Sequence, residues 1–166
     1  MRIWSFFLVS LICFGQSREE RIARAADALQ DALVKARRDF HQHPELSNRE
    51  ERTAKVVAEK LRALGLTDVK TGVGKHGVTA LLKGGKPGPV VAWRADMDAL
   101  PVFSSSTKPW KSVNGGVHHA CGHDAHIAIG LAVAELLAGM RADLPGGCLS
   151  APRQHPLARQ RPPTFR

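Results

Sequence analysis

The stretch around which this chain is organised runs from His118 to His126 and reads HHACGHDAH. Within nine positions it offers four imidazoles, one thiol and one carboxylate, and an apolar helical pattern follows at once. Such soft and borderline ligands suit a transition metal such as zinc far better than magnesium or calcium. A polar loop whose histidines cap the following helix is the simpler interpretation. The residues alone leave both interpretations open.

Length and composition predict one domain with an aliphatic core. The chain has 166 residues, of which 43% are hydrophobic and only 5% aromatic. The formal charge of +9 is not concentrated, because residues 147–166 contribute four arginines and the rest is spread over segments in which acidic and basic residues alternate. No basic run is interleaved with aromatic residues, which argues against a nucleic-acid-binding module.

The three cysteines lie in different contexts. Cys13 belongs to the N-terminal apolar run and Cys148 to the C-terminal segment, so Cys121 has no evident disulfide partner. This favours a metal-binding or reactive role for Cys121. A thiol nucleophile with His123 as its base is one such alternative.

Residues 1–17 have the pattern of a secretory signal peptide. Arg2 precedes an apolar run from Ile3 to Phe14, and the small-x-small sequence Gly15-Gln16-Ser17 follows. The run is shorter than the roughly 20 residues that a membrane-spanning helix needs. We therefore expect export to the periplasm or the exterior and no stable membrane span.

Two amphipathic helices are predicted in the first half of the chain. The first covers Ser17 to Phe40 and ends before Pro44, which places His41 and His43 at a helix C-terminus rather than in a metal site. The second follows Ser47-Asn48-Arg49-Glu50, which has the form of a capping box, and ends at Gly65.

Three short strands are predicted next, over residues 67–71, 78–83 and 89–95. The glycine-rich residues 84–88 predict a hairpin turn or another tight connection. Val90 to Trp93 are apolar without alternation, as in a strand that is covered on both faces. A helix through Ile127 and Met140 completes an α/β pattern, with a sheet covered by helices.

Two carboxylates follow the last of these strands. Asp96 and Asp98 lie where functional groups collect in open α/β sheets, just beyond the carboxyl end of a strand. One of them could orient a ligand histidine or hold a proton. An Asx turn at the strand end explains them equally well.

Three segments together resemble the metal-dependent amidohydrolases of the aminoacylase/carboxypeptidase superfamily, in the hippurate hydrolase and indole-acetyl-amino-acid hydrolase branch. They are Arg38–Ser47 (RDFHQHPELS), Trp93–Pro101 (WRADMDALP) and His119–Asp124 (HACGHD). The resemblance spans about Ile22 to Pro145. It implies that residues 18–146 form the N-terminal part of a zinc-peptidase-like α/β catalytic domain.

The resemblance also implies roles for individual residues. Cys121 and His123 are expected to be ligands in a two-metal site that holds zinc or manganese. Asp96 is expected to be the catalytic carboxylate that orients or tunes the site, with Asp98 as the second candidate. His119, Asp124 and His126 lie in the motif without an assigned ligand role. The implied reaction is metal-assisted hydrolysis of an amide in N-acyl amino acids or related small molecules. Full-length members are expected to dimerise through a second domain.

The chain departs from this family after Gly146. The family continues with an apolar strand and a Gln-Pro-Ala-Glu-Glu type motif that supplies the general base and another ligand. Residues 147–166 are instead rich in arginine and proline and contain no glutamate. We expect a disordered or out-of-frame tail, an unpaired strand before Asp96, and a chain that is inactive alone.

The coding DNA beyond Gly146, read in the other frames, tests the frameshift hypothesis. A small non-catalytic zinc-binding protein that uses Cys121, His123 and His126 is the alternative function.

Overall fold

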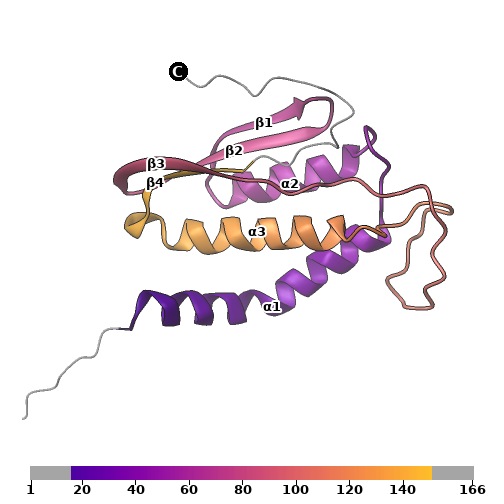
Figure 1. The fold of residues 1–166 in the computed structure, drawn as a ribbon, viewed down its shortest axis with the longest axis horizontal. Coiled ribbons are helices and arrows are strands. Elements are labelled where there is room, and N and C mark those ends of the chain that lie inside the picture. The colour runs from indigo at the N-terminus through magenta and orange to yellow at the C-terminus, as the bar shows by residue number, and fades with distance from the viewer. Residues whose placement is uncertain (1–15, 151–166) are drawn as a thin grey trace, which may run out of the picture.

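The computed structural model describes residues 16–150 and is an α/β structure, as predicted (Figure 1). Its elements are, in chain order, α1 (Arg18–Gln42), α2 (Glu51–Ala63), β1 (Thr67–Val73), β2 (Gly77–Lys83), β3 (Lys86–Trp93), α3 (His123–Gly139), the short 3-10 helix η1 (Arg141–Asp143) and β4 (Pro145–Ser150). The predicted signal peptide falls almost wholly on residues 1–15, which lie outside the described residues. Among residues 16–150, no helix combines the length and apolar character needed to cross a membrane.

The four strands form one sheet in the order β1-β2-β4-β3. Helices α2 and α3 pack beneath this sheet, and α1 packs against α3 farther from the strands (Figure 1). The core is aliphatic apart from Phe40, as the composition predicts. It is formed by Phe40, Ala54, Val57, Ala58, Leu61, Leu66, Val78, Ala80, Leu82, Met97, Ile127 and Ala134.

The bounds of α1 agree with the predicted helix to within two residues, and a capping box that was not predicted begins it. The Ser17 hydroxyl accepts a hydrogen bond from the Glu20 amide, and the Glu20 carboxylate accepts one from the Ser17 amide, each at 3.1 Å. At the other end, His41 lies in the last turn and His43 is the C-cap. The His43 amide donates to the carbonyl of Asp39, so this histidine helps to close the helix.

The predicted capping box of α2 is wrong. Residues 46–49 form a turn in which the Arg49 amide donates to the Leu46 carbonyl, so the helix begins only at Glu51. The first-turn amides are satisfied instead by the Glu45 carboxylate, which accepts from the Arg52 amide at 3.0 Å and the Thr53 amide at 2.8 Å. A carboxylate at this end of a helix also interacts favourably with the helix dipole.

Removing the Glu45 carboxylate tests this cap. We expect Glu45→Ala to lower the free energy of unfolding by about 1–2 kcal/mol, because two helix amides lose their acceptor. Ser47→Ala is the matched control and should cost less than about 0.5 kcal/mol. Urea unfolding followed by circular dichroism measures the free energy of unfolding of both variants. An equal decrease in the two would contradict the Glu45 cap and favour the predicted Ser47 capping box.

The predicted hairpin at residues 84–88 is also wrong, because β2 and β3 are not neighbours. Strand β4 lies between them, antiparallel to β2 and parallel to β3. The other predicted alternative, a tight connection, is confirmed, because only Gly84 and Gly85 separate β2 from β3. Their amides donate to the carbonyls of Gly146 and Arg141. The antiparallel hairpin is instead β1–β2.

Residues 147–150 are therefore part of the sheet and not of a disordered tail; residues 151–166 lie outside the described residues. The strand was not predicted because its glycines and small side chains are typical of a loop. Close backbone approach explains the glycines: a Cβ at Gly147 would lie 2.9 Å from the Leu82 carbonyl oxygen, and Gly146 has a φ of 72°. The strand before Asp96 consequently has a neighbour, contrary to expectation.

Strand β3 is exposed rather than covered on both faces, which corrects a further prediction. Val90 and Val91 are 62% and 63% exposed. Among the described residues β3 is an outer strand whose one neighbour is β4. Its apolar run meets α3 near Trp93, which lies close to Gly130.

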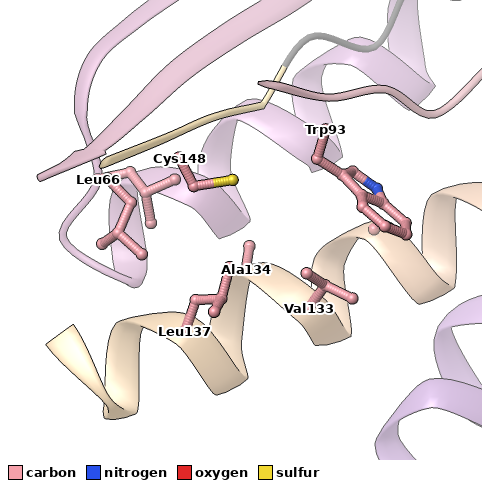
Figure 2. Close-up of a pocket in the computed structure, with 8 residues that line it drawn as sticks. Leu66, Trp93, Val133, Ala134, Leu137 and Cys148 are labelled. Atoms are coloured by element: carbon pink, nitrogen blue, oxygen red, sulfur yellow. The ribbon is translucent and has the colours of Figure 1, made fainter. Parts of the chain in front are cut away.

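Trp93, Cys148 and residues of α3 surround a small apolar pocket (Figure 2). Burial raises the pKa of the Cys148 thiol, so this side chain remains uncharged and behaves as a small apolar group. The pocket lies between the strands and α3 and does not include Cys121, His123 or Asp98.

Filling the pocket should stabilise the fold. We expect Cys148→Val to raise the free energy of unfolding by about 0.5–1 kcal/mol, because valine adds apolar volume and favours a strand. Leu137→Ala, which enlarges the same pocket, should lower it by about 2 kcal/mol. Thermal and urea unfolding provide the measurement; destabilisation by Cys148→Val would show that the pocket is already well packed.

Candidate metal-binding site

The candidate site lies where the segment after β3 meets the first turn of α3. Backbone bridges place this segment: Ala99 pairs with Leu46, and Leu100 pairs with His118. Gly122 directly precedes α3 with a φ of 82°, a left-handed conformation that glycine adopts without strain. This turn brings His123 and His126 to the segment that follows β3, where they contact Asp98 and Asp96.

His123 is held by Asp98. Its Nδ1 lies 2.9 Å from both the Asp98 backbone oxygen and the Asp98 carboxylate oxygen Oδ1. Both partners are acceptors, so Nδ1 must carry a proton, which leaves the Nε2 lone pair of a neutral ring free. Ligand histidines are usually held in this way, by a carboxylate or a carbonyl at the other nitrogen. Asp98 is only 6% exposed.

Asp96 has different partners. Its carboxylate forms an ion pair with Arg94, and its backbone amide donates to Nδ1 of His126 at 3.3 Å. The two carboxylates therefore have different roles. Asp98 orients the predicted ligand His123, while Asp96 lies between an arginine and a second histidine. The sequence favoured Asp96 for the orienting role, but it is Asp98 that contacts His123.

Cys121 is a free, exposed cysteine in the turn before α3. Among residues 16–150 no hydrogen bond joins it to His123, whose Nδ1 is occupied by Asp98. The thiol-nucleophile alternative therefore has no base in contact with the sulfur within this part of the chain. An exposed thiol and, two positions later in the chain, an imidazole with an available Nε2 lone pair do suit a borderline metal as ligands.

The described residues do not complete a metal site. Within residues 16–150, no group of three histidine, cysteine, aspartate or glutamate side chains is arranged to hold a metal ion. Cys121, His123 and His126 are therefore not found in such a group in this part of the chain, and the alternative function stays a prediction. Cys121 and His123 fit a metal as part of a larger set of ligands.

A buried polar cluster behind the site was not predicted. The Asp124 carboxylate, which is 1% exposed, lies 2.8 Å from Nδ1 of His41 and 3.4 Å from Nε of Arg37. Burial opposes ionisation of Asp124, but the His41 hydrogen bond and other favourable interactions outweigh it, so its pKa lies below the usual value. This contact ties the end of α1 to the first turn of α3.

His119 lies beside this cluster and is 4% exposed, and within residues 16–150 neither of its ring nitrogens has a hydrogen-bond partner. Burial lowers its pKa to about 4, although the charge of Asp124 opposes the shift. The ring is therefore neutral at pH 7. The motif contained both His119 and Asp124, but only the fold shows that Asp124 reaches across to α1.

Acid should destabilise the fold through His119. Its folded pKa is about 4 and its ordinary value 6.5, so between these values the unfolded chain binds the extra proton and stability falls as pH falls. The loss should approach about 3 kcal/mol at pH 4. His119→Gln should remove this part of the pH dependence. Urea unfolding from pH 4 to 7 measures it, and parallel curves for the two proteins would contradict the assignment.

Comparison with known proteins places the site in a family. The model of peptidase family M20/M25/M40 matches residues 92–149. An N-acyl-L-amino acid amidohydrolase of Geobacillus stearothermophilus is 44% identical over 77% of this chain and 34% of its own length. The thermostable carboxypeptidase 2 of Saccharolobus solfataricus is 47% identical over 71% of this chain and 30% of its own length.

A solved structure agrees with the fold. The Bacillus subtilis YXEP protein, described as a dinuclear metal-binding peptidase of the M20 family, superposes with a TM-score of 0.73 at 39% identity. The match covers 77% of this chain and 36% of that protein. The chain thus spans about a third of the length of the relatives it matches.

Proposed function

The chain belongs to peptidase family M20/M25/M40, and on that premise we propose that it carries part of the active site of a metal-dependent amidohydrolase that acts on N-acyl amino acids. The observation that carries this proposal is the Asp98–His123 contact, which leaves the Nε2 lone pair of His123 available two positions after the exposed Cys121. The similarity to a dinuclear metal-binding peptidase supports the use of divalent metal.

The roles of the residues follow from this contact. Cys121 and His123 would hold the metal, and Asp98 keeps His123 in the tautomer that can bind it. When bound in such a site, a divalent metal activates water and polarises a carbonyl group. Asp96, paired with Arg94, remains available beside the site as a second carboxylate. Zinc is proposed because thiolate and imidazole suit it better than calcium or magnesium, and manganese is the alternative metal that the family resemblance implies.

The proposed substrate class follows from the names of the two relatives. An N-acyl amino acid amidohydrolase and a carboxypeptidase both cleave an amide whose nitrogen belongs to an amino acid with a free carboxylate. A small amide with that carboxylate is therefore the substrate class that we propose here.

We further propose that the chain binds metal weakly and does not hydrolyse amides alone. Within residues 16–150 no group of three potential ligands is arranged to hold a metal, and residues 147–166 contain no glutamate that could act as a base. General acid–base catalysis alone contributes about 10²–10⁴-fold to such reactions. Export is proposed from the N-terminal sequence alone.

Cobalt(II), which replaces zinc and reports thiolate binding through a charge-transfer band, tests the metal site. We expect the band in the wild type and its loss in Cys121→Ser, whereas Cys148→Ser, the matched control, keeps it. Asp98→Asn should weaken binding by about 10-fold or more, because His123 loses its orienting carboxylate. A band that survives Cys121→Ser would place the metal elsewhere and reject the proposed site.

Hydrolysis assays test the second part of the proposal. The purified, metal-loaded chain should release no amino acid from N-acetylated amino acids above the rate of the free metal. Turnover that exceeds this background and disappears in Cys121→Ser would contradict the proposed inactivity while supporting the site.

A further inference from the structure

His126 differs from His123 in the chemistry of its contacts. Nδ1 of His126 accepts a hydrogen bond from the Asp96 amide, a group that can only donate. Nδ1 of His123 instead faces two oxygens of Asp98, which can only accept. The two rings therefore need opposite tautomers when both are neutral.

A neutral imidazole carries one proton, so its place follows from these partners. In His123 the proton is on Nδ1 and the Nε2 lone pair is free. In His126 the Nδ1 lone pair is already engaged, and the proton is on Nε2. His126 thus offers a hydrogen-bond donor at Nε2, where His123 offers a metal ligand.

The donor ring of His126 and the ligand ring of His123 lie close together. His123 and His126 are three positions apart on α3, their ring centroids are 6.3 Å apart, and the planes are inclined by 36°. The His126 side chain is 43% exposed, and Nε2 lies on the ring edge away from the Asp96 amide. The charged groups that face its Nδ1 side are Asp96, with a carboxylate oxygen 3.9 Å away, and Arg94, which neutralises that carboxylate.

We propose that His126 is a substrate-binding residue, whose Nε2–H donates to an oxygen of the N-acyl amino acid, and that it is not a metal ligand. The inference rests on the proposed function, because it takes the substrate from there. An amide carbonyl or a free carboxylate near His123 meets a neutral donor at this position. A ligand role would require Nε2 to give up its proton while Nδ1 keeps its hydrogen bond from the Asp96 amide.

The tautomers can be read in the metal-free wild type. Long-range ¹⁵N–¹H correlation spectra of the imidazoles, recorded where the rings are neutral, should show the Nε2–H form for His126 and the Nδ1–H form for His123. This measurement needs neither activity nor a substitution. Finding His126 in the Nδ1–H form would overturn the proposal.

Zinc titration separates this proposal from the metal site itself. Added Zn²⁺ should shift Nε2 of His123 strongly and leave the tautomer of His126 unchanged. If His126 responds as a ligand does, the present inference fails while the metal site stands. If neither Cys121 nor His123 responds, the proposed function fails, whereas the tautomer assignment still stands.

Two substitutions test the donor. Glutamine places an amide N–H near the position of the histidine Nε2–H, whereas alanine removes the donor. With N-acetyl-L-alanine as the probe in the presence of Zn²⁺, we expect His126→Gln to bind within about 3-fold of the wild type and His126→Ala about 10-fold more weakly, as for one lost hydrogen bond. Wild-type affinity in His126→Ala would overturn the substrate-binding role.

Discussion

The candidate site depends on the contact between Asp98 and His123. Asp98 is almost fully buried between Met97 and Ala99, which are themselves buried, so its carboxylate is expensive to place there without a partner. The Nδ1–H of His123 satisfies that carboxylate and the backbone carbonyl of the same residue. One imidazole therefore stabilises the buried segment after β3 and is itself fixed in the tautomer that can bind metal.

The first turn of α3 is held from its other side as well. Asp124 follows His123 and contacts His41 and Arg37 of α1, so neighbouring residues reach in different directions. A helix terminus held only by Asp98 could rotate about that contact, whereas a second anchor on α1 restricts the rotation. His123 and Asp124 therefore have different roles. His123 is the proposed metal ligand, and Asp124 joins α3 to α1.

The sequence predicted the regular elements well because their patterns are local. Helix α1, the core face of α2 and helix α3 all follow from apolar periodicity. Strand β4 could not be found in this way, since Gly146 and Gly147 are required by close contacts with other strands and not by their own neighbours in sequence. The Glu45 cap was missed for a related reason: the carboxylate lies six residues before Glu51 and reaches α2 only through the turn at residues 46–49.

For the site, the sequence named the residues but not their pairing. Asp96 and Asp98 are separated by two positions in the segment after β3, and His126 and His123 by three positions on α3. Residues three apart on a helix lie about 5–6 Å from each other, and residues two apart in an extended chain lie about 6–7 Å apart. The spacing of the two aspartates is therefore similar to that of the two histidines, so each aspartate can contact one histidine. The match places an acceptor pair opposite His123 and an amide donor opposite His126. Two identical side chains on one helix thereby acquire opposite protonation patterns, and this difference arises from the facing backbone and carboxylate rather than from the motif itself.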